Sequence, residues 1–172
     1  MTNHLTISVA LRRAKTLEGR VAELAKRLLG TTTWRADAPP AFGFEATLTE
    51  HDSAVEELLL LRTGIARANA LGTLSFEGLS LCLSEAIRRQ SELKGRIAQF
   101  ASFNLKCGTE RVSVSYDDRG RPVYDEVVHK AIWSEPERAA KLQELRTRLE
   151  ALNEVLEAAN HRIKIRVPPR TP

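Results

Sequence analysis

The sequence predicts a mainly α-helical fold: a four-helix bundle, or antiparallel coiled coil, of long helices with short β-hairpins at the ends. Three observations predict it. Apolar residues recur at alternating three- and four-residue steps in four long segments. The period changes to two in short stretches between and after them. Aromatic residues make up only 5% of the 172 residues, so the core must be mostly aliphatic, which suits helix packing. At this length a single domain is expected.

The clearest apolar seam predicts a last helix over 136–160. Glu, Lys and Arg fill most of the positions that flank the seam. Since an apolar seam is not stable in water, other helices are expected to cover it. Ser134 or Glu135 is expected near the N-cap, with Pro136 in the first turn. The seam consists of Leu142, Leu145, Leu149, Leu152, Leu156 and Ala159.

The same three- and four-residue spacing of apolar residues predicts a first helix over 6–29 and a second over 53–71. Gly30 is expected to end the first helix as a C-terminal glycine. Ser53 and Glu56 have the spacing of a capping box, which predicts the start of the second helix. The wide apolar face of the second helix predicts that it is the most buried of the four.

The segment 31–47 is expected to be a loop because its prolines and glycine interrupt any helix. It carries Trp34, Phe42 and Phe44. The simpler interpretation is that these aromatic side chains hold the loop on the bundle. The alternative is that they bind a partner.

Alternation predicts the β-elements and one more helix. A hairpin is expected over 73–83, with its turn at Glu77 and Gly78. A third helix is predicted over 84–105, with Ser84 as its N-cap. A second hairpin is predicted over 111–128, and a final strand over 161–167.

No spacing in the sequence predicts a catalytic, cofactor or metal site. The phosphate-binding loops, the nucleophile elbow and the zinc-binding helix motif are absent. Glu126 and His129 match half of the Glu-x-x-His pair of di-iron bundles, but that chemistry needs the pair twice. Cys82 and Cys107 follow no metal-binding spacing, and two cysteines in a chain of this size indicate a reducing compartment.

The most suggestive polar group is Arg67 and Asn69 near the end of the second helix, together with Asn160 at the end of the last. The simpler interpretation is helix capping, because Asn tolerates the left-handed conformation at helix ends. The alternative is a small polar pocket at one end of the bundle.

The charge balance is mildly basic, with a net charge of +4 and a pI near 9.3. This permits attraction to phosphate without requiring it. Interleaved aromatic residues, which stack on bases, are absent from the basic segments. The candidate anion-binding residues are Arg88, Arg89, Arg162, Lys164 and Arg166.

These observations predict a structural or interaction protein rather than an enzyme. Three or four apolar seams exceed what one chain needs to cover internally, which predicts a homo-oligomer; a different protein partner is the other option. Nucleic-acid association through the basic residues is the alternative function. The N-terminus lacks the features of a secretory signal, and the longest apolar run, 58–61, is too short to span a bilayer. A cytoplasmic protein without membrane association is therefore expected.

Four segments resemble the septicolysin-like proteins, a group of small bacterial helical coiled-coil proteins whose function is uncharacterised. They are ALRRAKTLEGRVAELAKRL, LRTGIARANALGT, LSEAIRRQSEL and LQELRTRLEALNEVLEAANHRIKI. Arg67 and Asn69 stand where that family shows Arg-x-Asn, and Asn160 where it shows an Asn that ends the last helix. His161 replaces the Trp that usually follows, and the segment 109–132 departs most from the family pattern. The resemblance implies a helical coiled-coil fold and assigns no activity.

Overall fold

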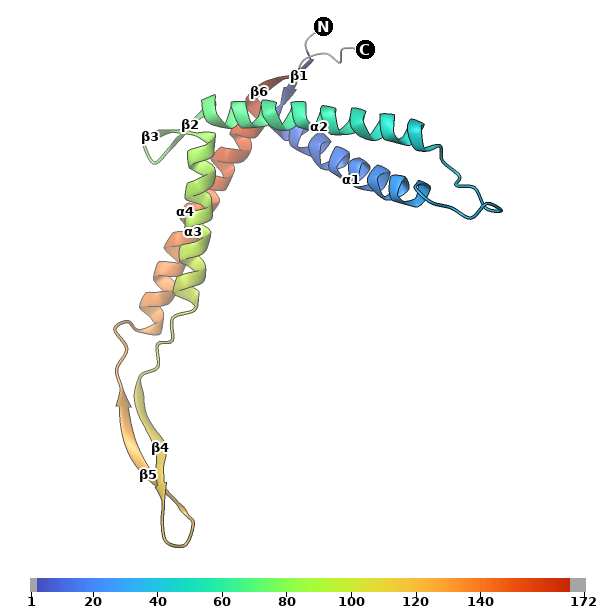
Figure 1. The fold of residues 1–172 in the computed structure, drawn as a ribbon. Coiled ribbons are helices and arrows are strands. Elements are labelled where there is room, and N and C mark those ends of the chain that lie inside the picture. Colours follow the sequence, from blue (N-terminus) through green and yellow to red (C-terminus); the bar gives the residue numbers. More distant parts are fainter. Residues whose placement is uncertain (1–2, 168–172) are drawn as a thin grey trace. The chain divides into compact units, whose positions relative to one another are not determined.

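A computed structural model describes residues 3–167 of the chain (Figure 1). Four helices alternate with short strands, which pair antiparallel as three separate two-stranded sheets, β1–β6, β2–β3 and β4–β5. Two compact units make up the chain, one of residues 1–88 and 152–172 and the other of residues 89–151. In chain order the elements are β1 Asn3–Thr6, α1 Ile7–Thr31, α2 Phe44–Leu71, β2 Thr73–Phe76, β3 Leu79–Cys82, α3 Leu83–Ala101, β4 Gly108–Tyr116, β5 Pro122–His129, α4 Glu135–Arg162 and β6 Lys164–Val167.

The predicted four-helix bundle with hairpins at its ends is wrong. The strands are interspersed with the helices along the chain rather than confined to the ends of a long bundle. The physical reason is that apolar spacing marks which face of a helix is buried but not what buries it. In the first unit a strand helps to cover α2: Ile165 of β6 is only 2% exposed, and a side chain at Gly64 would meet it at 3.3 Å.

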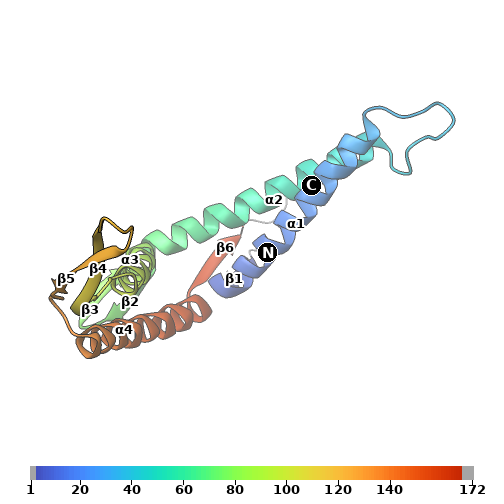
Figure 2. The same ribbon diagram turned by 90° about the horizontal axis from the view of Figure 1, so that it is seen from below.

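Helices α1 and α2 form an antiparallel pair in the first unit (Figure 2). The buried face is rich in small residues, including Ala10, Ala14 and Ala54, which let the two backbones approach closely. Three ion pairs on the exposed sides run between the helices, and pairs of this kind each contribute little to stability. They are Arg13–Glu57, Arg20–Glu50 and Arg62–Glu18.

The two ends of the described chain meet in the sheet β1–β6. Thr6 is the N-cap of α1, and its hydroxyl accepts a hydrogen bond from the N–H of Val9 at 3.4 Å. The next residue, Ile7, donates its N–H to the carbonyl of Ile163 at 3.0 Å. Helix α4 continues to Arg162, so the final strand begins later than the predicted range 161–167.

Helix α2 begins at Phe44, well before the predicted start at Ser53, so the predicted capping box at Ser53 is wrong. Gly43 is the N-cap, and its carbonyl accepts hydrogen bonds from both the N–H and the hydroxyl of Thr47, at 3.1 and 2.8 Å. The extra turns carry Glu50, which pairs with an arginine of α1. This contact with α1 stabilises the turns of α2 that precede Ser53. No local sequence pattern predicts it.

The β2–β3 hairpin turns at Glu77 and Gly78, the residues at which the alternation predicted the turn. Both have positive φ, 50° and 77°, as the tight two-residue turn of a hairpin requires. Ser84 is not the N-cap of α3, which begins at Leu83. Instead, the Ser84 hydroxyl donates to the carbonyl of Asn69 at 3.0 Å, which joins the start of α3 to the end of α2.

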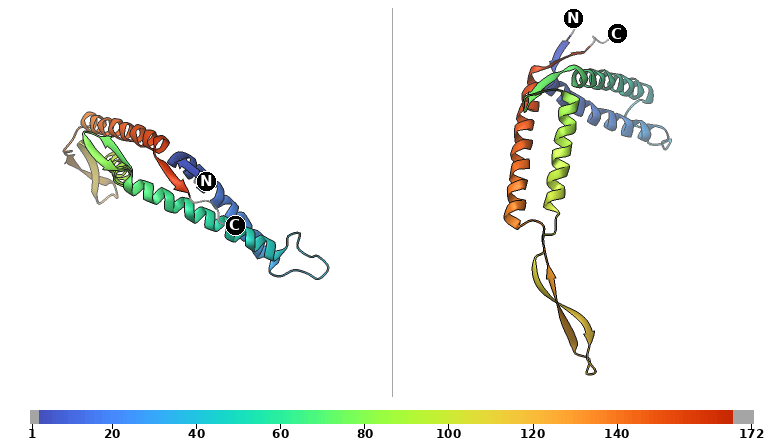
Figure 3. Two further views of the ribbon diagram at one scale, coloured as in Figure 1. Left: turned by 90° about the horizontal axis from the view of Figure 1, so that it is seen from above. Right: turned by 90° about the vertical axis from the view of Figure 1, so that its left-hand side faces the viewer.

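In the second unit α3 ends and the chain continues into β4 (Figure 3). Three aromatic side chains gather near this end of α3. The ring of Phe100 lies 5.1 Å from that of Phe103 and 5.2 Å from that of Trp133. Arg138 of α4 donates to the carbonyls of Ala101 and Phe103 at 3.2 and 3.1 Å. These contacts satisfy carbonyls at the C-terminus of the helix, and α3 ends at Ala101 rather than at the predicted residue 105.

Most of the predicted seam of α4 is buried in this single chain. Only Leu149 among its six members is half-exposed. The seam of α1 is likewise mostly buried. These two helices therefore leave no surplus seam of the kind from which the homo-oligomer was predicted. The buried members on α4 are Leu142, Leu145, Leu152, Leu156 and Ala159.

Candidate interaction surfaces

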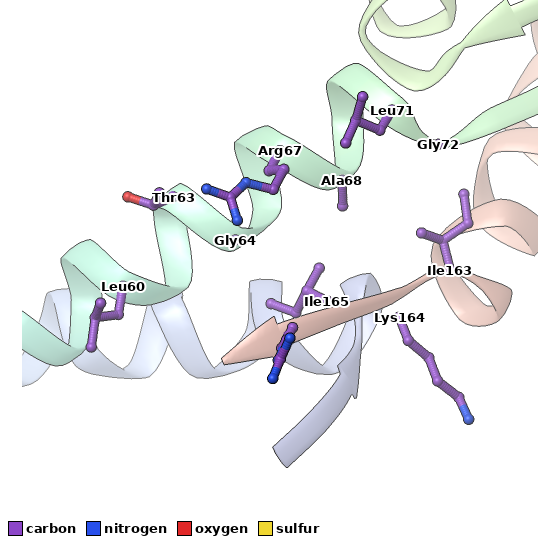
Figure 4. A pocket seen from close by; sticks show the side chains of 11 residues that line it. Leu60, Thr63, Gly64, Arg67, Ala68, Leu71, Gly72, Ile163, Lys164 and Ile165 are labelled. Carbon is purple, nitrogen blue, oxygen red and sulfur yellow. The ribbon is translucent and has the colours of Figure 1, made fainter. Parts of the chain in front are cut away.

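A groove in the first unit lies between α2 and β6 and has a volume of 520 Å³ (Figure 4). Such a volume is within the range of ligand-binding clefts. Apolar residues form most of its lining, and neither Asp nor Glu is among the described residues that line it. The lining residues are Leu60, Thr63, Gly64, Arg67, Ala68, Leu71, Gly72, Ile163, Lys164, Ile165 and Arg166.

Only one member of the predicted polar group lines this groove. Arg67 does so, and its exposed side chain extends along α2 beside Gly64 (Figure 4). Asn69 and Asn160 are half-exposed and are not among the lining residues. The carbonyl of Asn69 accepts the hydrogen bond from Ser84, which ties this end of α2 to α3.

The five candidate anion-binding residues lie in different places. Lys164 and Arg166 line the groove together with Arg67. Arg162, at the end of α4, donates to the carbonyl of Thr73 at 3.3 Å. The other two, Arg88 and Arg89, lie side by side in the sequence of α3, and Arg88 is exposed.

The β4–β5 hairpin of the second unit is the other large uncovered surface. The register places Val112 and Val127 on one face, with Tyr124 and Val128 on the other. A bulge between Ser113 and Ser115 interrupts the ladder. All seven apolar and aromatic side chains of the strands other than Pro122 are exposed, up to 72% at Tyr116. They are Val112, Val114, Tyr116, Val123, Tyr124, Val127 and Val128.

The base of this hairpin carries a small ionic cluster. The carboxylate of Glu110 pairs with the ammonium of Lys106 and lies 2.9 Å from Nε2 of His129. The hydrogen bond from Lys106, followed by that from His129, holds the pKa of Glu110 below its ordinary value. His129 thus contacts Glu110 on the neighbouring strand. Glu126, the other residue of the predicted Glu-x-x-His pair, lies three residues before His129 on the same strand.

Neither cysteine forms a disulfide. Hydrogen bonds from Ser84 and from the backbone lower the pKa of the half-buried Cys82 thiol. Cys107 is exposed. Across residues 3–167, no three His, Cys, Asp or Glu side chains are grouped closely enough to hold a metal ion.

The simpler interpretation, that the aromatic residues of the α1–α2 loop hold it on the helices, fits Phe42, which contacts Arg27 of α1, but not the largely exposed Trp34. Trp34 is 58% exposed, and Phe42 and Phe44 are also exposed. Phe42 lies under the guanidinium of Arg27 at 4.6 Å, a cation–π contact at an exposed site. Phe44 is the first residue of α2.

A comparison with protein-family models found no match, and neither did a search of curated proteins. Among solved structures, the chain is similar to the crystal structure of a functionally unknown conserved protein from Corynebacterium diphtheriae. The TM-score is 0.70 at 19% sequence identity, over 95% of this chain and 99% of that one. This likeness shows a shared fold. The resemblance to septicolysin-like proteins stays a prediction, and the chain has the fold of a protein whose own function is unknown.

Proposed function

We propose that this chain is an interaction protein that self-associates through the β4–β5 hairpin. The main observation in support is that this hairpin has exposed apolar side chains on both faces. A two-stranded hairpin is only marginally stable by itself in water, and three or more strands with an apolar face are usually needed. Further strands at its edge would complete such a sheet.

The charges along the strands favour β4 as the edge that pairs with a second copy. The β5 edge carries adjacent acids, Asp125 and Glu126, and begins with Pro122. Acids and proline at an edge oppose further pairing. The β4 edge carries Glu110 followed by Arg111 and has no proline. Residues directly opposite each other share a face of the sheet, so a two-fold antiparallel pair of β4 strands is centred on a single residue. Centring it on Val112 sets the two Val112 side chains opposite each other and each Glu110 opposite Val114 of the other copy.

The resulting sheet has the strand order β5–β4–β4–β5. Its two-fold symmetry makes the interface self-complementary, because each Val112 faces the same residue of the other copy. Like charges placed directly across two strands would destabilise the pairing, and this register opposes none. This pairing replaces the apolar helix seams from which self-association was first predicted.

Sedimentation velocity over a range of protein concentrations tests this proposal. A species of twice the 19.2 kDa chain mass is expected to grow with concentration. Val112→Lys and Val112→Glu each place like charges opposite each other at the centre of the interface and should abolish the dimer. Mixing these two variants places opposite charges there and should restore a dimer of one copy of each.

Val127→Lys is the matched control. Val127 lies on the same face of the hairpin as Val112 and is as exposed, but it belongs to β5, which does not pair with the other copy. This variant should dimerise like the unmodified protein. A protein that stays monomeric at all concentrations, or variants that all dimerise equally, would contradict the proposal.

Association with nucleic acid is a second candidate function. Lys164 and Arg166 lie two residues apart on β6 and so share one face of that strand, which supports a contact with phosphates. Binding to duplex DNA that weakens steeply with salt would support this function. Absence of binding at low salt would remove it.

A cytoplasmic location is also part of what we propose. Within residues 3–167, no helix is long and apolar enough to cross a membrane.

A further inference from the structure

Helix α2 exposes apolar side chains that no other described part of the chain covers. Val55 and Leu59, both near its middle, are 40% and 56% exposed. Only four of its side chains are buried, against six on the shorter α1. Those four are Thr47, Ala54, Leu58 and Leu61. The prediction that α2 is the most buried of the four helices is therefore wrong.

The exposed residues form a regular stripe along α2. Its members recur at alternating four- and three-residue steps, the spacing of a coiled-coil seam. Four of them directly follow the four buried residues in the sequence, so the stripe lies about 100° around the helix from the face that packs on α1. Gly64, against which β6 packs, is five residues after Leu59 and therefore lies about 140° around the helix from it. All members are exposed except the half-buried Leu48: they are Leu48, Asp52, Val55, Leu59, Arg62 and Ala66.

Two members of the stripe are charged, and their charges are opposite. Asp52 lies three residues before Val55, and Arg62 lies three residues after Leu59. Their side chains are 70% and 60% exposed. The whole helix shows the same asymmetry, since its acids all precede the four leucines at 58–61 and its arginines follow them. A surface that complements the stripe is therefore basic beside the first half of α2 and acidic beside the second.

A second copy of α2 in antiparallel orientation has this complementary distribution. A two-fold axis midway between Val55 and Leu59 sets each of these residues opposite the other in the second copy. The remaining members of the stripe then pair with one another in the outer layers. A parallel pair in register would instead set like charges opposite each other, which opposes association. From the centre outward, the antiparallel layers are Leu59 with Val55, Arg62 with Asp52, and Ala66 with Leu48 of the other copy.

We propose that two copies of the chain associate through this stripe, with α2 packed antiparallel on α2. Two apolar layers form the centre of the contact, and the pairs of Arg62 with Asp52 on either side fix its register. The contact extends over residues 48–66, about 27 Å of one helix in each copy. Because it is short and lacks main-chain hydrogen bonds, it is weaker than the pairing of β4 strands proposed above. It does not rest on that pairing, and a chain with both self-complementary surfaces assembles beyond the dimer at high concentration.

Val112→Lys serves as the background for the test, since it removes the pairing of β4 strands and leaves α2 unchanged. Sedimentation velocity should show this variant as a monomer where the unmodified protein dimerises, and as a dimer at ten to one hundred times that concentration. Adding Leu59→Lys should raise the dissociation constant of the latter dimer at least tenfold, because it sets an ammonium group in each central layer. Leu71→Lys is the matched control: Leu71 is 75% exposed on the same helix but lies about 120° around it from Leu59. It should leave the dissociation constant within twofold.

The charged layers have their own pair of variants in the same background. Asp52→Arg and Arg62→Asp each set like charges opposite each other in both layers and should dimerise at least tenfold more weakly. Mixing them restores opposite charges in both layers, so the mixture should form a dimer of one copy of each. Circular dichroism checks that the variants stay folded. Should Arg62→Asp fail to fold because it loses its ion pair with Glu18, Asp52→Arg and Leu59→Lys test the contact without it.

Two outcomes would overturn the proposal. One is a Val112→Lys variant that stays monomeric even at one hundred times the concentration at which the unmodified protein dimerises. The other is equal dimerisation of the Leu59→Lys and Leu71→Lys variants. If Val112→Lys dimerises as readily as the unmodified protein, the pairing of β4 strands is wrong, and loss of that dimer in Leu59→Lys supports the α2 contact alone.

Discussion

Gly64 of α2 lies directly against Ile165 of β6, so that a side chain at the glycine would begin 3.3 Å from Cδ1 of the isoleucine. Ile165 is among the most buried residues of the first unit. This contact sets the distance between α2 and β6 and therefore the width of the groove beside them. A small residue within the helix is what allows the strand to approach.

Gly64→Leu should lower the free energy of unfolding by about 1–3 kcal/mol, the usual cost of adding atoms to a packed contact. The comparison is Gly19→Leu on α1, where nothing lies within 4 Å of the new side chain. Because glycine weakens a helix, the Gly19 variant should be unchanged or more stable by up to about 1 kcal/mol. Urea unfolding followed by circular dichroism measures both. Equal effects at the two positions would show that β6 does not pack on Gly64.

Gly78→Ala should destabilise the protein by about 1–2 kcal/mol. Gly78 has a φ of +77° in the β2–β3 turn, a left-handed conformation that disfavours residues with a Cβ atom by about this amount. Gly30→Ala is the control: the prediction that Gly30 ends the first helix is wrong, since α1 runs to Thr31, and Gly30 is helical with open space around it and no positive φ. Thermal unfolding of the two variants should shift the midpoint in opposite directions, and a stabilised Gly78 variant would contradict the turn.

Arg138→Ala should destabilise the second unit by about 1–3 kcal/mol. Its guanidinium donates to the carbonyls of Ala101 and Phe103, and the loss of a charged donor leaves those carbonyls without this partner. Trp133 fluorescence should report the change, since its ring stacks with Phe100 close to these carbonyls. The control Arg146→Ala removes an exposed arginine of α4 and should stay within about 0.5 kcal/mol.

The start of α4 should show a pH-dependent contribution to stability. The carboxylate of Glu137 accepts the N–H of Ser134 at 2.7 Å and also its hydroxyl at 2.7 Å, and the backbone hydrogen bond is the main reason that its pKa is lowered. A carboxyl group with a lower pKa in the folded state stabilises the fold above its unfolded pKa, and this is lost as the pH falls through the folded value. Glu137→Ala should thus be less stable than the unmodified protein at pH 7, and the difference should shrink on acidification below the ordinary glutamate pKa, near 4.3.

The comparison for this pH series is Glu154→Ala, an exposed residue of α4 whose carboxylate makes no hydrogen bond or ion pair within residues 3–167. Urea unfolding at several pH values between 7 and 3 measures both variants. If the difference in unfolding free energy between Glu137→Ala and the unmodified protein stays constant over this pH range, the carboxylate does not cap the helix.

The candidate surfaces could be predicted only in part from the sequence. Alternation of Val112, Val114 and Tyr116 with serines predicted the second hairpin, but not that both of its faces are exposed. Arg67 and Lys164 were each noted as candidates, in separate groups. They line one groove because β6 returns to α2 through the pairing with β1, which joins residues far apart in sequence. Asn69 and Asn160 had equally suggestive positions in the sequence, yet they lie outside the groove.

The sequence by itself determined most of where the chain is helical and where it turns, because these depend on local spacing: the leucine steps of α4, the glycine at position 78, and Ser134 or Glu135 at the start of α4. Only the tertiary structure decided what covers each apolar face. It placed Ile165 of a strand, rather than a further helix, against Gly64, and it extended α2 back to Phe44 through turns that carry the ion pair of Glu50 with α1. The physical reason is that burial is non-directional: an apolar face favours any apolar partner of the right shape, so its spacing specifies the face but not the neighbour.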